Sequence, residues 1–81
     1  MNKYLITVIV PEIEMEYDIY IPNNKKMGTI KKYILKSITK LSDNSLPENA
    51  RFVDRSTGYE YGNDVYVRDA GIKNGSKIVI M

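Results

Sequence analysis

The sequence contains no cysteine and no histidine. Without cysteine there is neither a disulfide nor a thiol nucleophile, and without histidine there is no imidazole for a metal site or a serine-protease-type triad. No run of about 18 apolar residues occurs, so we expect no membrane span. These absences exclude the commonest catalytic constellations, and we predict a protein that is not an enzyme and that needs no metal or other cofactor.

The chain is short and carries little net charge. Its 81 residues are enough for one domain, 1–81, with a single small core. Twelve basic and ten acidic residues leave a net charge of +2, which is too small to indicate nucleic-acid binding by itself. A hydrophobic content of 43% is typical of a folded domain rather than a disordered one. A cytoplasmic location is compatible with the absence of cysteine, and we expect no small-molecule substrate.

One segment, residues 29–41, has the pattern of a long amphipathic helix. Its apolar residues recur with a period near ~3.6, which places them on one face. They are Ile30, Ile34, Ile38 and Leu41. Thr29 is an acceptable N-cap for this helix. No other segment has a comparable pattern, so a single helix must cover a sheet built from the rest of the chain.

The segments around this helix are rich in β-branched and aromatic residues. Residues 3–10 barely alternate, as in a central strand, whereas residues 14–21 alternate as in a half-exposed strand. Short strands are expected at 51–54 and 59–61, and 77–81 is a final apolar strand. We place the first and last strands side by side mid-sheet because they are the most apolar. The prediction is an α+β β-grasp, with one helix packed across a mixed sheet of four to five strands.

The C-terminal part resembles the end of ubiquitin-type proteins, with a polar turn that leads into a final apolar strand. It is more similar still to the YukD-like ubiquitin-fold proteins of type VII (WXG100) secretion systems in Gram-positive bacteria, where a D-x-G-I-x-N-G pattern recurs at this place. Here the pattern consists of Asp69, Gly71, Ile72, Asn74 and Gly75. The similarity extends back through the helix and covers nearly the whole chain.

This resemblance implies a small cytoplasmic module of a bacterium that acts in, or regulates, type VII secretion through protein–protein contacts. Its partners would be components of the secretion machinery. Ubiquitin-like modifiers and sulfur carriers need a flexible Gly-Gly tail, whereas this sequence stops at Met81. We therefore expect a non-conjugating protein. The alternative is a sulfur carrier or protein modifier whose C-terminal tail is missing from this sequence.

The sheet face turned away from the helix is the first candidate binding surface. Alternation within the last strand turns Val79 and Met81 outward, beside one of Phe52 or Val53. Adjacent apolar groups on a solvated sheet form a docking patch. The resemblance agrees with this choice, because ubiquitin-like folds typically bind partners through the same face. The alternative is ordinary surface hydrophobicity.

The second candidate surface is a basic cluster on the outer helix face and the loop before it. Its members are Lys25, Lys26, Lys32, Lys36 and Lys40. Such a cluster can bind an acidic protein, anionic lipid or nucleic acid, although a helix face lined by lysines is usually only solvated. Only Tyr20, Tyr59 and Tyr61 are expected to face outward, which is few for base stacking. We therefore expect a protein partner rather than nucleic acid.

Overall fold

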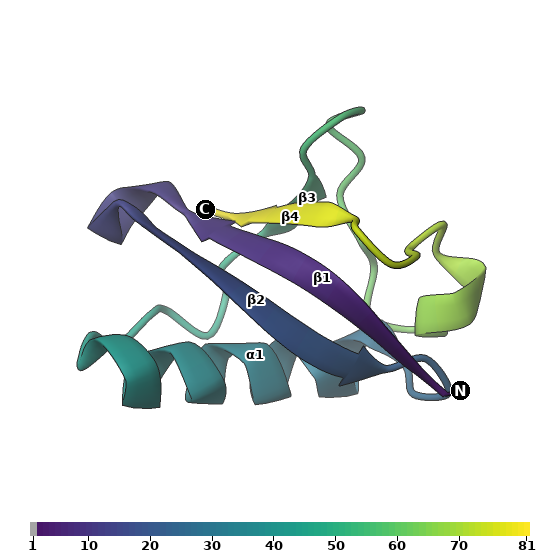
Figure 1. Ribbon diagram of the computed structural model, residues 1–81, viewed down its shortest axis with the longest axis horizontal. Helices are drawn as coiled ribbons and strands as arrows, with labels where there is room; N and C mark the ends of the chain where they lie inside the picture. Colours follow the sequence, from purple (N-terminus) through teal and green to yellow (C-terminus); the bar gives the residue numbers. More distant parts are fainter. Residues whose placement is uncertain (1) are drawn as a thin grey trace.

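The computed structural model describes residues 2–81. Its helix and strands are β1 (Lys3–Val10), β2 (Met15–Pro22), α1 (Met27–Ser42), β3 (Phe52–Asp54) and β4 (Lys77–Ile80). The strands form one sheet in the order β2-β1-β4-β3, and α1 lies across one face of it (Figure 1). This architecture confirms the predicted α+β class with one helix on a mixed sheet.

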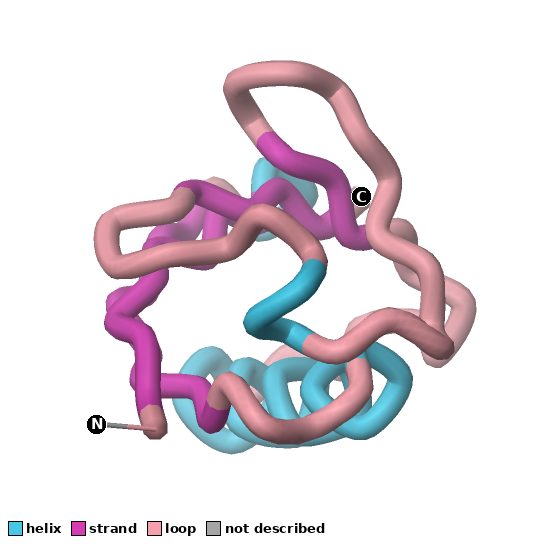
Figure 2. The backbone as a smooth tube through the Cα atoms, turned by 90° about the vertical axis from the view of Figure 1, so that its right-hand side faces the viewer, coloured by secondary structure: helices cyan, strands magenta, loops and turns pink. Residues whose placement is uncertain are grey.

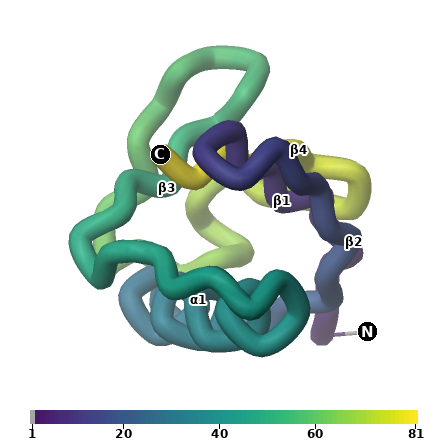
Figure 3. The backbone as a smooth tube through the Cα atoms, turned by 90° about the vertical axis from the view of Figure 1, so that its left-hand side faces the viewer, coloured from purple at the N-terminus to yellow at the C-terminus, as the bar shows by residue number. Residues whose placement is uncertain are grey.

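The sheet combines antiparallel and parallel pairs. β1 and β2 form an antiparallel hairpin, β1 runs parallel to β4, and β3 runs antiparallel to β4. The first and last strands are therefore the two central ones, as predicted. Pairing continues past β4, because the amide of Met81 donates to the carbonyl of Arg51 at 3.0 Å and the reverse bond is 2.9 Å. Figures 2 and 3 look along the helix from its two ends and show the sheet arched over α1.

The core lies between the inner face of the sheet and one side of α1. Side chains alternate along each strand, so every second residue points at the helix. The buried strand residues on this inner face are Ile6, Val8, Val10, Ile19, Ile21, Phe52, Ile78 and Ile80. The helix contributes Met27, Ile30, Ile34 and Ile38. Three of the four residues predicted for the buried helical stripe are therefore in the core.

The helix begins earlier than the sequence pattern indicated. Thr29 is not the N-cap, because the chain is already helical from Met27. The amide of Met27 donates to the carbonyl of Val65 at 2.8 Å, and that of Gly28 donates to Asn63 at 2.9 Å. A distant loop thus satisfies the amides that a local cap would otherwise have to satisfy.

Leu41 was expected in the core but is 64% exposed. It lies in the last turn of α1, which ends at Ser42 before Asp43 adopts a left-handed conformation. Leu46, from the loop that follows, packs against the core instead. The inward-facing side of a helix is buried only as far as there is another element opposite it.

Residues 59–61 do not form the expected strand. Only an isolated bridge pairs Glu60 with Val53, while the amide of Tyr61 donates to the carbonyl of Phe52 at 2.9 Å. Because this short return runs beside β3, it carries the ring of Tyr61 into the core, where 3% of the residue is exposed. The prediction that Tyr61 faces outward was wrong, whereas Tyr20 and Tyr59 are exposed as expected.

The contrast between Ile34 and Leu41 tests how the helix packs. Truncation of the fully buried Ile34 to alanine should lower the free energy of unfolding by about 2–5 kcal/mol, because a cavity replaces its side chain. Leu41→Ala on the same helix should change it by less than about 0.5 kcal/mol. Urea unfolding followed by circular dichroism measures both, and equal losses would contradict this packing.

Candidate functional site

The sheet face turned away from α1, called here the outer face, carries a row of apolar side chains. Register pairs Ile9 with Val79 and Val79 with Val53, so these three point the same way. Their strand neighbours Val8 and Ile78 are buried in the core, which turns Ile9 and Val79 outward. We call Ile9, Val53 and Val79 the apolar row.

The accessible part of the apolar row lies on β1 and β4. Ile9 and Val79 are half-buried, whereas Val53 is 9% exposed and Met81, the next outward residue after Val79, is 62% exposed. Phe52, the other candidate, pairs with Ile80 and has no exposed surface. Phe52 is therefore a core residue and has to be removed from the expected binding set, because it faces the helix side of the sheet.

A polar row crosses the outer face next to the apolar row. Thr7 pairs with Asp18 on one side and with Lys77 on the other. The hydroxyl of Thr7 donates to a carboxylate oxygen of Asp18 at 2.8 Å. Arg55 continues this row, since its amide donates to the carbonyl of Lys77 at 3.0 Å. Carboxylates thus occupy the β2 side of the outer face and cations occupy the β3–β4 side.

The far end of the outer face holds a hollow of about 530 Å³ around Leu5 and Tyr20. The two side chains are cross-strand neighbours and are 37% and 59% exposed. The turn at Asn74–Gly75 borders this hollow, because Asn74 Oδ1 accepts from the amide of Leu5 at 2.7 Å and the amide of Gly75 donates to its carbonyl at 2.8 Å. The D-x-G-I-x-N-G segment therefore anchors β1 and shapes the outer face.

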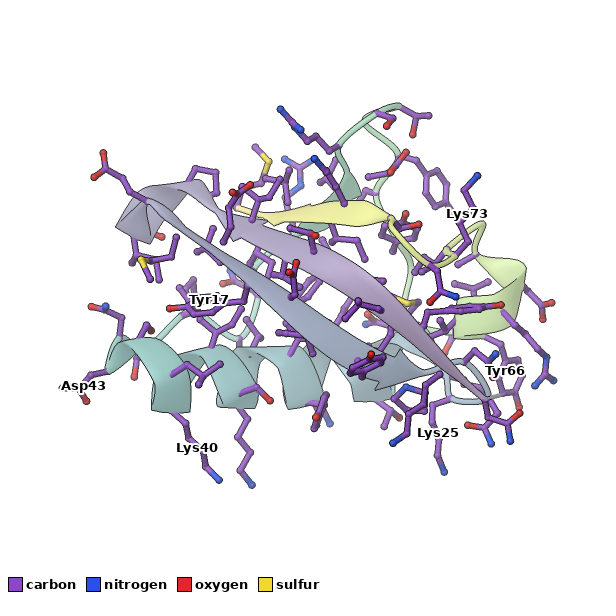
Figure 4. The ribbon with its side chains drawn as sticks, viewed as in Figure 1. Tyr17, Lys25, Lys40, Asp43, Tyr66 and Lys73 are labelled. Atoms are coloured by element: carbon purple, nitrogen blue, oxygen red, sulfur yellow. The ribbon has the colours of Figure 1, made fainter. Side chains whose placement is uncertain are left out.

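The predicted basic cluster does not converge on one site. Its five lysines are all exposed, and Figure 4 shows Lys25 near one end of the helix and Lys40 pointing away from the sheet near the other. Lys32 and Lys36 border a groove of about 580 Å³ between the helix and the loop that follows it. These lysines line the helix side of the molecule rather than the outer face.

Arg68, which was not assigned to the cluster, lies close to Lys26 around one aromatic ring. Its guanidinium is 5.0 Å from the centre of the Tyr66 ring, and Lys26 Nζ is 6.0 Å from it. Both distances fall in the range of cation–π contacts. No periodicity in the sequence relates these residues, because only the backbone pairing of 25–26 with 66–67 brings them together.

Lys31 has a structural role that the sequence pattern did not reveal. Its Nζ donates to the carbonyl of Tyr61 at 2.6 Å and to Asn63 Oδ1 at 2.8 Å, and lies 5.7 Å from the centre of the Phe52 ring. Burial lowers the pKa of Lys31, while the charge of Glu60 acts in the opposite direction. Lys31 thus ties the loop at 61–63 to the helix.

Clusters of metal-binding side chains and helices that could span a membrane are both absent from the described residues. Between residues 2 and 81, no group of three His, Cys, Asp or Glu side chains is placed so that it could hold a metal ion. No helix within the same range has the length and apolar character needed to cross a membrane.

Comparison with known proteins identifies the fold. Neither a family model nor a curated protein matches the sequence. Among solved structures, the chain is similar over its full length to the ubiquitin-like domain of an Arabidopsis thaliana protein, with a TM-score of 0.71, 18% identity and 78% of that chain covered. It is also similar to the ubiquitin of Caldiarchaeum subterraneum, with a TM-score of 0.72, 14% identity and coverage of 96% of this chain and 90% of that one.

A third similar structure is a chain of the toluene 4-monooxygenase HD complex with the inhibitor 4-bromobenzoate. Its TM-score is 0.77 at 8% identity, with 96% of this chain and 95% of that one covered. At these identities the likeness concerns the fold alone. The protein has a ubiquitin-like fold, in which one helix packs on a four-stranded mixed sheet.

The tie made by Lys31 can be tested by substitution. Lys31→Met keeps the length of the side chain but leaves the carbonyl of Tyr61 and the amide oxygen of Asn63 without this donor. We expect the free energy of unfolding to fall by about 1–2 kcal/mol. Lys32→Met, on the exposed neighbour, is the matched control and should change it by less than about 0.5 kcal/mol. Chemical denaturation that gives equal values for the two variants would exclude the tie.

Tyr61 should make stability depend on alkaline pH. Burial, assisted by the charges of Asp54 and Tyr59, raises the pKa of Tyr61 from 10.0 to about 12. The native state therefore keeps the phenol proton after the unfolded chain has lost it, so stability must fall as the pH rises from about 10 to about 12. Urea unfolding at about pH 9 and about pH 11 should show a smaller loss for Tyr61→Phe than for the wild type, and an equal loss would contradict this assignment.

Proposed function

We propose that this protein is a non-catalytic ubiquitin-like interaction module that binds a protein partner through its outer face. The observation that carries the proposal is the accessible part of the apolar row, Ile9 and Val79, with Met81 beside it on a sheet face that no helix covers. An interface of this kind has an apolar centre that excludes water and a polar rim that orients the partner. The polar row supplies such a rim, with Asp18 at one side and Lys77 at the other.

A protein partner suits this face better than a small molecule. The hollow near Leu5 and Tyr20 is lined by both charged and apolar groups, whereas a small-molecule pocket is concave and mostly apolar. The outer face instead offers accessible contact points spread over β1, β2 and β4. A partner with a complementary surface can cover several of them at once.

We further propose that the protein acts in the bacterial cytoplasm as an accessory or regulatory component of type VII secretion. The support is the resemblance of the segment from Asp69 to Gly75 to the YukD-like proteins, together with the ubiquitin-like fold that those proteins share. On this proposal, the partner bound by the outer face belongs to the secretion machinery.

Charge placed in the apolar row should abolish partner binding. The chain is immobilised and exposed to cytosol from its source organism, and retained proteins are quantified by mass spectrometry. Val79→Asp, and Met81→Asp at a residue that is 62% exposed, should each reduce partner recovery at least about 10-fold, because a buried unpaired charge is costly at an apolar interface. Tyr33→Asp is the matched control on the helix, at a residue that is 50% exposed.

The partner recovered in this way is then purified. Its direct binding to the wild type and to the Val79→Asp, Met81→Asp and Tyr33→Asp variants is measured by calorimetry. Met81→Asp is included because its side chain has little packing to lose, so a loss of binding cannot be attributed to unfolding. Undiminished binding by both outer-face variants, or an equal loss with Tyr33→Asp, would refute the proposed face. A partner unrelated to secretion would refute the type VII assignment alone.

A further inference from the structure

A cavity lined by cations lies beside the apolar row. It has a volume of about 560 Å³ and is formed by the turn after β3 and the turn before β4. Arg55 comes from the first turn, Lys73 comes from the second, and Lys77 is the first residue of β4; we call these three residues the basic pocket. Figure 4 shows Lys73 projecting from its turn, on the side of the molecule away from the helix lysine Lys40.

The basic pocket carries an excess of positive charge, because three cations and a single carboxylate, that of Asp54, line it. Arg55 and Lys77 are neighbours across the β3–β4 pairing, an arrangement in which like charges repel. The only ion pair within residues 2–81 joins Arg51 to Glu60 at 3.0 Å and involves none of the three. All three side chains are exposed, so water screens most of this repulsion and the excess positive charge is accessible to a ligand.

The one carboxylate that lines the pocket, Asp54, is held by hydrogen bonds within its own turn and offsets only one of the three positive charges. Asp54 Oδ2 accepts from the hydroxyl of Thr57 at 2.7 Å and from its amide at 3.2 Å. The opposite turn is also closed, because Ser76 Oγ accepts from the amide of Lys73 at 2.9 Å. The two turns are thus fixed by their own hydrogen bonds, and the cations project from preformed walls.

We infer that the basic pocket binds carboxylate side chains of an acidic segment in the protein partner, directly beside the apolar contact. The inference rests on the proposed function and deepens it by naming the chemistry of the partner. An apolar side chain of the partner covers Val79, and acidic side chains next to it reach Lys77 and Arg55. Charge complementarity of this kind fixes the register of the partner and speeds its association.

The same face argues against a nucleic acid as the occupant. A polyanion that follows a protein surface needs a continuous basic track. Here the polar row changes sign within the sheet, since Asp18 lies on the same row as Lys77, and Glu16 lies beside the apolar row at Ile9. The lysines of α1 are on the other side of the molecule and cannot extend the track.

The pocket can be tested without the partner, by nuclear magnetic resonance titration of the ¹⁵N-labelled chain. The probe is a triglutamate peptide with blocked ends, added at neutral pH and constant ionic strength. Amides at 54–56 and 71–77 should shift saturably with a dissociation constant of roughly millimolar size, as is reasonable for a few exposed charge pairs. A triglutamine peptide should produce no such shifts.

Two triple variants serve as test and matched control, since each removes three positive charges. R55Q/K73Q/K77Q should weaken triglutamate binding at least about 5-fold, whereas K32Q/K36Q/K40Q on the helix should bind as the wild type does. The first variant also removes the Arg55–Lys77 repulsion, so it should unfold no more easily than the wild type. Binding that survives in this variant, or equal shifts around the helix lysines, would overturn the inference.

A parallel titration with inorganic phosphate tests the chemistry of the ligand. Carboxylate recognition predicts that phosphate saturates the same amides no more tightly than triglutamate does, and a clearly tighter phosphate complex would overturn it. If the triglutamate titration fails while Val79→Asp still abolishes partner binding, the inference is wrong and the proposed function stands. If the titration succeeds while Val79→Asp leaves partner binding intact, the proposed face is wrong and carboxylate binding by the pocket stands.

Discussion

A single helix can cover only one face of a four-stranded sheet, and this constraint determines the character of the molecule. The central strands β1 and β4 carry apolar residues on both faces of the sheet. Their inner residues are buried under α1, whereas Ile9 and Val79 face outward with nothing packed above them but each other and their flanking side chains. The outer face is therefore the one on which we propose that a partner binds.

The long connection between β3 and β4 belongs to the core as much as the strands do. It supplies the carbonyls of Asn63 and Val65 that close the start of the helix, and it carries the buried ring of Tyr61. Lys31 fastens it from the helix side. These contacts hold the middle of the connection on the inner side of the sheet. Its two ends are turns at the edge of the outer face, and they line the basic pocket.

The features that were predictable from the sequence depend on local patterns. Helical periodicity located α1, and alternation in the last strand correctly turned Val79 outward. The errors arose where residues distant in sequence meet. Thr29 is no cap, because a remote loop closes the helix. Tyr61 is buried, because its segment returns along β3. The lysines of the helix were grouped by their spacing, whereas Arg55 and Lys77 become neighbours only through the pairing of β3 with β4.

The pairing of β1 with β4 has a consequence for how the protein folds during its synthesis. Thr7 lies beside Lys77, so the centre of the sheet joins segments that are far apart in the sequence. Contacts of this range slow folding, because a large loop must close before they form. During synthesis the β1–β2 hairpin and α1 leave the ribosome before β4. The isoleucines on the surfaces by which the hairpin and the helix face the core are then still exposed to solvent. The core is complete only when residues 77–80 pair between β1 and β3, and until then these apolar surfaces are exposed to aggregation.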